Sequence, residues 1–162
     1  MSILSTVVGE ELAPLVKPPI TLEQLHRYAE ASGDHNPMHL DEEAAHRVGL
    51  DSVIAQGMLS MAFLGQFVGQ HISDAPEAYL AQLKVRFTDM VRLGDTLTCH
   101  GIVKERTINE SGHAAAVVEC WAQNQKGEKV TVGEAIVVVT GPADPGRPST
   151  PGQAQDLPLL YT

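Results

Sequence analysis

The chain has little of what several protein classes require. It contains only two cysteines, Cys99 and Cys120, and their wide separation matches neither a zinc knuckle nor a redox pair. Isolated thiols of this kind are typically buried and free, which favours a reducing compartment. Basic residues are also few, with 11 Lys and Arg against 20 Asp and Glu and a formal net charge of -9. That excess of negative charge disfavours nucleic acid and anionic membrane surfaces as partners.

Signals for secretion or membrane insertion are also missing. Residues 1–10 have neither a basic start nor a long apolar run, so they do not form an ordinary secretory signal. Residues 53–72 are apolar and long enough to suggest a membrane span, but glutamine, serine, histidine and glycine residues interrupt them. This composition is typical of a helix buried inside a soluble protein. We therefore expect a cytoplasmic protein.

Length and composition favour one folded domain. A chain of 162 residues with 43% hydrophobic content can bury a single core. We expect this domain to span residues 1–140. Residues 141–162 are rich in Pro, Gly, Ser and Gln, which predicts a loose tail or a strap across a neighbouring subunit.

The first half of the chain is predicted to be helical. Thr21 begins one helix in a capping-box pattern, and Gly33 ends it. Pro37 prevents that helix from continuing through residues 34–40, which we expect to form a loop of fixed shape. Two further helices are predicted, a short one from Asp41 through Val48 and a long apolar one that starts near Gln56 or Gly57.

The second half has the alternation of antiparallel strands. Strands are predicted at residues 79–88, 96–107, 114–124 and 129–140, with turn sequences at 109–112 and 126–128. In the first strand, one face is predicted to carry Tyr79, Ala81, Leu83, Val85 and Phe87.

A long helix followed by consecutive strands predicts a single α+β domain, with the antiparallel sheet wrapped around the helix. Gly57, Gly65 and Gly69 lie near one face of that helix, where we expect them to let its backbone approach the sheet. The alternative is that they only loosen the helix.

Asp34 and His39 are the candidate catalytic residues. A stiff loop containing Pro37 joins them, so a carboxylate and an imidazole can share one water molecule and handle opposite ends of a proton transfer. Such general acid–base catalysis typically contributes about 10²- to 10⁴-fold in rate. Taken singly, Asp34 would be read as a turn residue and His39 as a surface imidazole.

The residues around this pair resemble a known family, the MaoC-like (R)-specific enoyl-CoA hydratases and 3-hydroxyacyl dehydratases of the hot-dog fold. The family pattern Asp-x-Asn-Pro-x-His is matched by Asp34, Asn36, Pro37 and His39. Residues 49–58 are similar to the family segment that leads into its central helix. The resemblance covers roughly residues 20–140.

The resemblance implies reversible hydration of an α,β-unsaturated acyl thioester, with the (R)-3-hydroxyacyl product and no cofactor. In that assignment Asp34 and His39 hold the attacking water. The thioester oxygen accepts a hydrogen bond from the Gly57 N–H, at a helix start where backbone N–H groups are free and the helix dipole favours negative charge.

Three further residues are candidate supports for this site, namely Asn36, Gln56 and Ser60. Gln56 departs from the histidine that many family members carry, and it cannot titrate. Gly65 stands where some members have a serine, and Ser60 lies elsewhere on the helix. Ser60 could contact Asn36, but an exposed or back-bonded serine is the simpler reading.

Substrate and partners follow from the same resemblance. The thioester carrier is coenzyme A or acyl carrier protein, and Lys84 with Arg86 could form a local basic patch, although solvated surface charge is the simpler reading. An exposed sheet edge predicts a homodimer or higher homo-oligomer.

Three alternatives stay open: an acyl-CoA thioesterase, a non-catalytic partner subunit of a heteromeric dehydratase, and a metal site. The metal site would use nearby histidines such as His35 and His39, but Pro37 breaks the helix that would align them. We therefore expect no metal.

Overall fold

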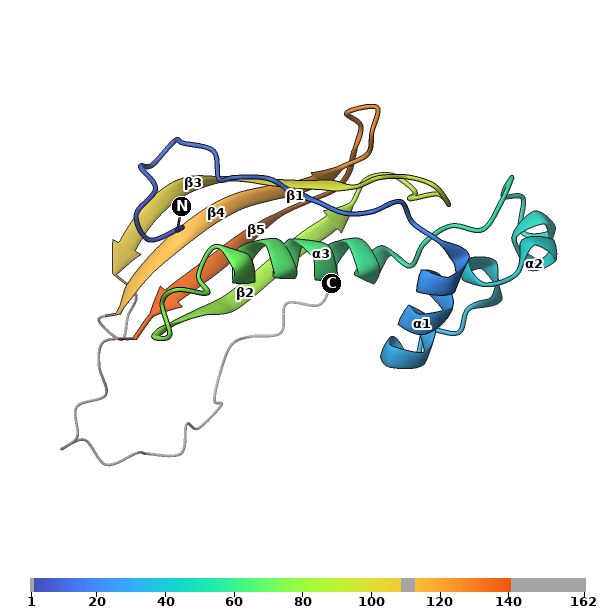
Figure 1. The fold of residues 1–162 in the computed structure, drawn as a ribbon, viewed down its shortest axis with the longest axis horizontal. Helices are drawn as coiled ribbons and strands as arrows, with labels where there is room; N and C mark the ends of the chain where they lie inside the picture. Colours follow the sequence, from blue (N-terminus) through green and yellow to red (C-terminus); the bar gives the residue numbers. More distant parts are fainter. Residues whose placement is uncertain (1, 109–112, 141–162) are drawn as a thin grey trace, which may run out of the picture.

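The computed structural model describes residues 2–108 and 113–140. A five-stranded antiparallel sheet curves around the long helix α3 (Gly57–Gln70), as Figure 1 shows. The strand order is β1-β3-β4-β5-β2, with bounds Leu15–Val16 for β1, Ala78–Phe87 for β2, Thr98–Ile108 for β3, Ala114–Gln123 for β4 and Lys129–Val139 for β5. This confirms the predicted α+β plan, while the predicted turn at 109–112 and tail at 141–162 lie outside the described residues.

The N-terminal segment supplies a strand that the sequence did not predict. Residues 15 and 16 form β1, which pairs antiparallel with Thr98 and Cys99 of β3. A strand of two residues is too short for an alternating pattern to be recognised. The segment before it is fastened by the Arg106 guanidinium, which donates hydrogen bonds to the backbone carbonyl oxygens of Ile3, Leu4 and Thr6.

The predicted face of β2 is wrong at its beginning. Tyr79 is 49% exposed, whereas Leu80 packs against the core. A bulge between Leu80 and Gln82 adds one residue to the strand, so inward-pointing positions change from even to odd numbers and Leu83 becomes a core contact. A single unbroken alternation could not predict this change.

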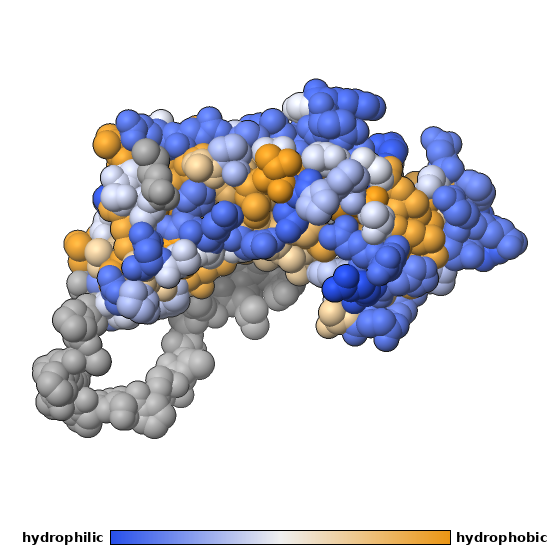
Figure 2. Space-filling model, viewed as in Figure 1, coloured by the Kyte–Doolittle hydropathy of each residue, from blue (hydrophilic) through white to orange (hydrophobic). Residues whose placement is uncertain are grey.

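Side-chain caps set the helices that precede α3. In α1 (Leu22–Ser32) the Thr21 hydroxyl accepts the Gln24 N–H at 3.2 Å, and Gly33 ends the helix with φ 78°. A short 3-10 helix, η1 (Pro37–His39), follows. The Asp41 carboxylate then accepts the Ala44 N–H at 2.7 Å and begins α2 (Glu42–Arg47). Figure 1 shows α1 and α2 beyond the N-terminal end of α3, and Figure 2 shows that the α2 lobe is hydrophilic.

Helix α3 provides much of the core, but its glycines do not all face the sheet. The prediction holds for Gly57, where an added Cβ would lie 3.3 Å from the Phe87 ring of β2. At Gly65 the nearest such atom is a Leu83 methyl at 4.0 Å, and at Gly69 no atom lies within 4 Å. The prediction is therefore wrong for Gly69, because this residue lies on the exposed side of the helix. The close approach occurs instead at Gly101 of β3, where a Cβ would lie 2.8 Å from the Phe67 ring.

Both cysteines are buried and free, as predicted. Burial raises the pKa of Cys99 and of Cys120 to about 12. In the part of the chain that the structure describes, no helix combines the length and the apolar character needed to cross a bilayer.

Candidate active site

The loop between α1 and η1 is shaped by its own side chains. The Ser32 hydroxyl accepts the Asp34 N–H at 3.2 Å, and the Asp34 Oδ1 accepts the Asn36 N–H at 3.3 Å. The Asn36 side-chain oxygen in turn accepts the Met38 N–H at 3.3 Å. These consecutive turns, followed by Pro37 at the start of η1, fix the loop as predicted.

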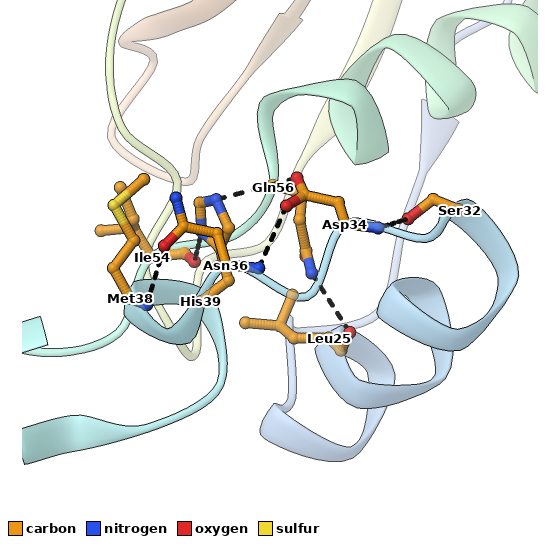
Figure 3. A network of polar contacts seen from close by, with 8 residues as sticks. All are labelled: Leu25, Ser32, Asp34, Asn36, Met38, His39, Ile54 and Gln56. Carbon is orange, nitrogen blue, oxygen red and sulfur yellow. Dashed lines mark hydrogen bonds and ion pairs between the residues drawn. The ribbon is translucent and has the colours of Figure 1, made fainter. Parts of the chain in front are cut away.

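The two candidate catalytic side chains face each other across this loop (Figure 3). Asp34 Oδ2 lies 4.0 Å from His39 Nε2, which is too long for a direct hydrogen bond. The His39 side chain is 8% exposed and that of Asp34 is 44% exposed. His39 is therefore not a surface imidazole. Asp34 does have the turn role considered above, through Oδ1, and its other oxygen is directed at His39.

A backbone carbonyl in the segment before α3 determines the tautomer of His39. His39 Nδ1 lies 2.7 Å from the Ile54 carbonyl oxygen, which can only accept a hydrogen bond. Nδ1 therefore carries a proton, and in the neutral ring Nε2 has the lone pair. Residue 54 is itself held by a bridge to Arg92 and by the bond from the Ala55 N–H to the Val91 carbonyl at 2.8 Å. Sequence reasoning missed Ile54, because a backbone acceptor leaves no signal in residue type.

Gln56 links the start of α3 to α1. Its side chain is fully buried, and Nε2 donates to the Leu25 carbonyl oxygen at 3.3 Å. Its Oε1 has no partner among the described residues. The hydrogen bond thus reaches α1, which leads into the Asp34 loop, rather than the loop itself.

Ser60 is back-bonded, as the simpler reading predicted, but it is buried rather than exposed. Its hydroxyl donates to the Gly57 carbonyl oxygen at 2.7 Å and shares a 2.6 Å hydrogen bond with the Thr131 hydroxyl of β5. Its partners are thus the first turn of α3 and the sheet, instead of Asn36. Thr131 is a second residue that the sequence did not reveal, because 71 positions separate it from Ser60.

Tyr28 lies within electrostatic reach of the site from α1. Burial raises the pKa of Tyr28, and the negative charge of Asp34 raises that pKa further. The phenol therefore stays protonated to higher pH than an ordinary tyrosine, and it reports on the charge of Asp34.

The described residues do not gather a metal site. No group of three or more His, Cys, Asp or Glu side chains in residues 2–108 and 113–140 is placed to hold an ion. The exposed His35 side chain lies 3.8 Å from the Glu30 carboxylate.

Comparison with known proteins identifies the family to which this arrangement belongs. The family model described as a MaoC-like domain matches residues 4–134, most of the chain. The chain belongs to the MaoC-like dehydratase family. This confirms the resemblance that Asp34, Asn36, Pro37 and His39 suggested.

Relatives and solved structures agree with that assignment. The chain is 30% identical to a 3-hydroxybutyryl-CoA dehydratase of Methylorubrum extorquens, over 79% of this chain and 78% of the relative. It is also 30% identical to an (R)-specific enoyl-CoA hydratase of Rhodospirillum rubrum, over 74% of this chain and 80% of the relative. An (R)-hydratase from A. caviae involved in PHA biosynthesis matches with a TM-score of 0.72 and 26% identity, covering 84% of this chain and 98% of that one. The predicted hot-dog fold and the predicted hydratase–dehydratase class are thereby confirmed.

Proposed function

We propose that this protein catalyses the reversible hydration of an enoyl thioester to an (R)-3-hydroxyacyl thioester, with Asp34 and His39 activating the water. The observation that carries the proposal is the facing pair, Asp34 Oδ2 and His39 Nε2 at 4.0 Å, on a loop beside the start of α3. The (R) configuration rests on similarity to proteins that are named (R)-specific.

The chemistry follows from the groups present. A water oxygen that bonds to C3 of the enoyl group must lose one proton, and C2 must gain one. Because His39 Nδ1 is occupied by the Ile54 carbonyl, Nε2 is the ring atom available to accept a proton. The Asp34 carboxylate is the second group within reach of the same water, so the two residues can divide proton removal and proton delivery.

Charge develops on the thioester carbonyl oxygen as C3 is attacked. Gly57 is the first residue of α3, and the first-turn N–H groups of a helix have no partner within it. In this proposal the Gly57 N–H donates to the thioester oxygen, aided by the positive end of the helix dipole. Loss of one such donor in other enzymes costs about 10²- to 10³-fold in rate.

The supporting residues act on geometry. The Asn36 side chain fixes the start of η1 and therefore the direction of His39. Gln56 ties α1 to α3 on either side of the Asp34 loop, and Ser60 holds the carbonyl of Gly57. In these roles Gln56 needs a hydrogen bond and not a titrating group, so its replacement of histidine is compatible with activity.

The test uses Asp34→Asn and His39→Ala with a purified enoyl-CoA. The conjugated absorbance of the substrate should disappear with the wild-type protein and without release of free thiol. Both variants should fold and lose about 10²- to 10⁴-fold in kcat. His35→Ala is the matched control, because that exposed imidazole lies in the same loop and should leave the rate unchanged.

Three outcomes would count against this proposal. Thiol release by the wild-type protein would indicate a thioesterase. Full hydration activity in both Asp34→Asn and His39→Ala would contradict the assignment of the site, and a wild-type protein without any turnover would indicate a partner subunit of a heteromeric dehydratase.

We also propose that the active form is an assembly of at least two copies. Strand β2 lies at an edge of the sheet, and apolar residues of α3 such as Met58, which is 52% exposed, are left uncovered. Exposed apolar residues on a helix favour cover by another surface, and an unpaired edge offers backbone hydrogen bonds to a second chain. Native mass measurement should therefore find a multiple of 17.4 kDa, and Met58→Glu should reduce the mass to one copy.

A further inference from the structure

Phe87 covers one side of the turn to which the thioester oxygen is proposed to bind. A Cβ placed on Gly57 would lie 3.3 Å from three atoms of the Phe87 ring, Cδ1, Cδ2 and Cε2. Equal distances to three ring atoms mean that the ring presents its face to Gly57. Phe87 is also 45% exposed, so part of the ring remains open beside the first turn of α3.

The backbone that carries this ring is tied to the same turn of α3. Phe87 pairs with Thr131 of β5, and the Thr131 hydroxyl is bonded to Ser60 at 2.6 Å. Ser60 in turn donates to the Gly57 carbonyl oxygen at 2.7 Å, which closes a circuit of contacts around the turn. The next residue, Thr88, donates from its N–H to the Val130 carbonyl at 2.9 Å. The ring thus projects from a strand that is fastened to this turn, and it forms a wall beside Gly57.

We infer that Phe87 is a specificity-determining residue, which makes the protein favour enoyl thioesters without a substituent on C2. This inference rests on the proposed function. C2 is bonded directly to the carbonyl carbon, so a methyl group on C2 adds volume next to the Gly57 turn and the ring that covers it. Lengthening the acyl chain at C4 and beyond adds atoms farther from this wall, so Phe87 discriminates at C2 and not by chain length.

The experiment compares kcat/KM for but-2-enoyl-CoA and 2-methylbut-2-enoyl-CoA. In Phe87→Ala, the ratio of the methylated to the unsubstituted substrate should rise by at least about tenfold, the lower end of what one methylene group contributes in a tight pocket. Phe87→Leu should give a smaller rise, and Phe87→Trp should lower the ratio. Tyr79→Ala is the control, because Tyr79 is a similarly exposed aromatic residue of the same strand, 49% exposed, that lies at its other end.

The failure of this inference and the failure of the proposed function give different results. A wild-type protein that hydrates neither substrate contradicts the proposed function. If the wild-type protein hydrates but-2-enoyl-CoA and the ratio stays within about twofold in Phe87→Ala, or rises equally in Tyr79→Ala, then Phe87 does not set specificity. If Phe87→Ala does not fold, Phe87→Leu and Phe87→Trp decide the question by the same ratio.

Discussion

The Ile54 carbonyl determines which tautomer the neutral His39 ring adopts. It accepts a hydrogen bond from Nδ1 and leaves Nε2 directed at Asp34. In the proposed mechanism, a backbone atom therefore decides which ring nitrogen can accept a proton. The pairing of Asp34 with His39 was predictable from their types and from Pro37 between them. The role of the Ile54 carbonyl was not predictable, because every residue has a carbonyl oxygen and only the fold brings this one close to the imidazole.

Tyr28 offers a direct reading of the charge on Asp34. Its pKa is raised by burial and then by the Asp34 carboxylate. Asp34→Asn removes the negative charge and keeps the burial, so the pKa of Tyr28 should fall while staying above that of a free tyrosine. Titration of tyrosinate absorbance, with Tyr28→Phe subtracted in each background, measures the shift. An unchanged Tyr28 pKa would place Asp34 too far away to act on α1.

The buried Ser60–Thr131 pair should behave as a unit. Ser60→Ala leaves the Thr131 hydroxyl without its 2.6 Å partner and should lower the free energy of unfolding by about 1–3 kcal/mol. The double variant with Thr131→Val should lose less than the sum of the two single losses, with a coupling of about 0.5–3 kcal/mol. Urea denaturation of all four proteins completes the cycle.

Ser73→Ala is the matched control for that cycle. Ser73 is exposed and its hydroxyl also donates to a backbone carbonyl, that of Gln70 at 3.1 Å. Its loss should change the free energy of unfolding by less than about 0.5 kcal/mol. Strict additivity of Ser60→Ala and Thr131→Val would mean that the two hydroxyls contribute independently.

At the level of elements, the sequence predicted best where a local signal marks a boundary. Thr21 and Asp41 cap their helices through side-chain oxygens, and Gly33 ends α1 through its left-handed backbone, as their residue types predicted. The changed face of β2 and the exposed position of Gly69 were not predictable, because a bulge and the orientation of a helix depend on partners distant in sequence. For the same reason, the sequence did not predict that Thr131 and Phe87 lie beside the start of α3.

Glycines in β5 and α3 should respond in opposite ways to an added methyl group. At Gly133, a Cβ would lie 2.2 Å from the Lys84 carbonyl oxygen and 3.1 Å from the Val85 Cα, so β2 and β5 must separate to accept it. Gly133→Ala should therefore lower the free energy of unfolding by about 1–3 kcal/mol or more. Gly69→Ala meets no atom within 4 Å and should raise it by up to about 1 kcal/mol through helix propensity.

Denaturant titration of the two glycine variants measures both effects. Equal stability of Gly133→Ala and the wild-type protein would contradict the close approach of β2 to β5. A loss of stability in Gly69→Ala would indicate that another chain packs against that turn of α3.

At the scale of the whole molecule, the two buried thiols report on global unfolding. Burial raises the pKa of Cys99 and Cys120 from 9.0 to about 12, so the reactive thiolate is suppressed in the folded protein. A disulfide reagent should leave both thiols unmodified under native conditions and should titrate both in denaturant. Rapid modification of the native protein would mean that the core opens locally.

The same thiols predict how stability depends on pH. Between pH 9 and 12 the unfolded chain loses the thiol protons while the folded chain keeps them. The folded state then binds more protons, so the free energy of unfolding should fall as pH rises through this window. Denaturation midpoints across the window measure the slope, which should be shallower in Cys99→Ala, and an unchanged slope would assign the alkaline loss to other groups.

The hydrogen bonds from Arg106 to the N-terminal segment have a consequence for which amino-acid substitutions that segment tolerates. The three acceptors, at Ile3, Leu4 and Thr6, are main-chain carbonyl oxygens. These contacts therefore depend on the path of the backbone and not on which side chains the segment carries. A planar guanidinium holds five N–H donors in a fixed fork, whereas a lysine ammonium has three donors around a single nitrogen on a flexible stem and does not reproduce this geometry. Substitution of Arg106 would therefore remove all three of these bonds, whereas substitutions at positions 3, 4 and 6 would leave their carbonyl acceptors in place.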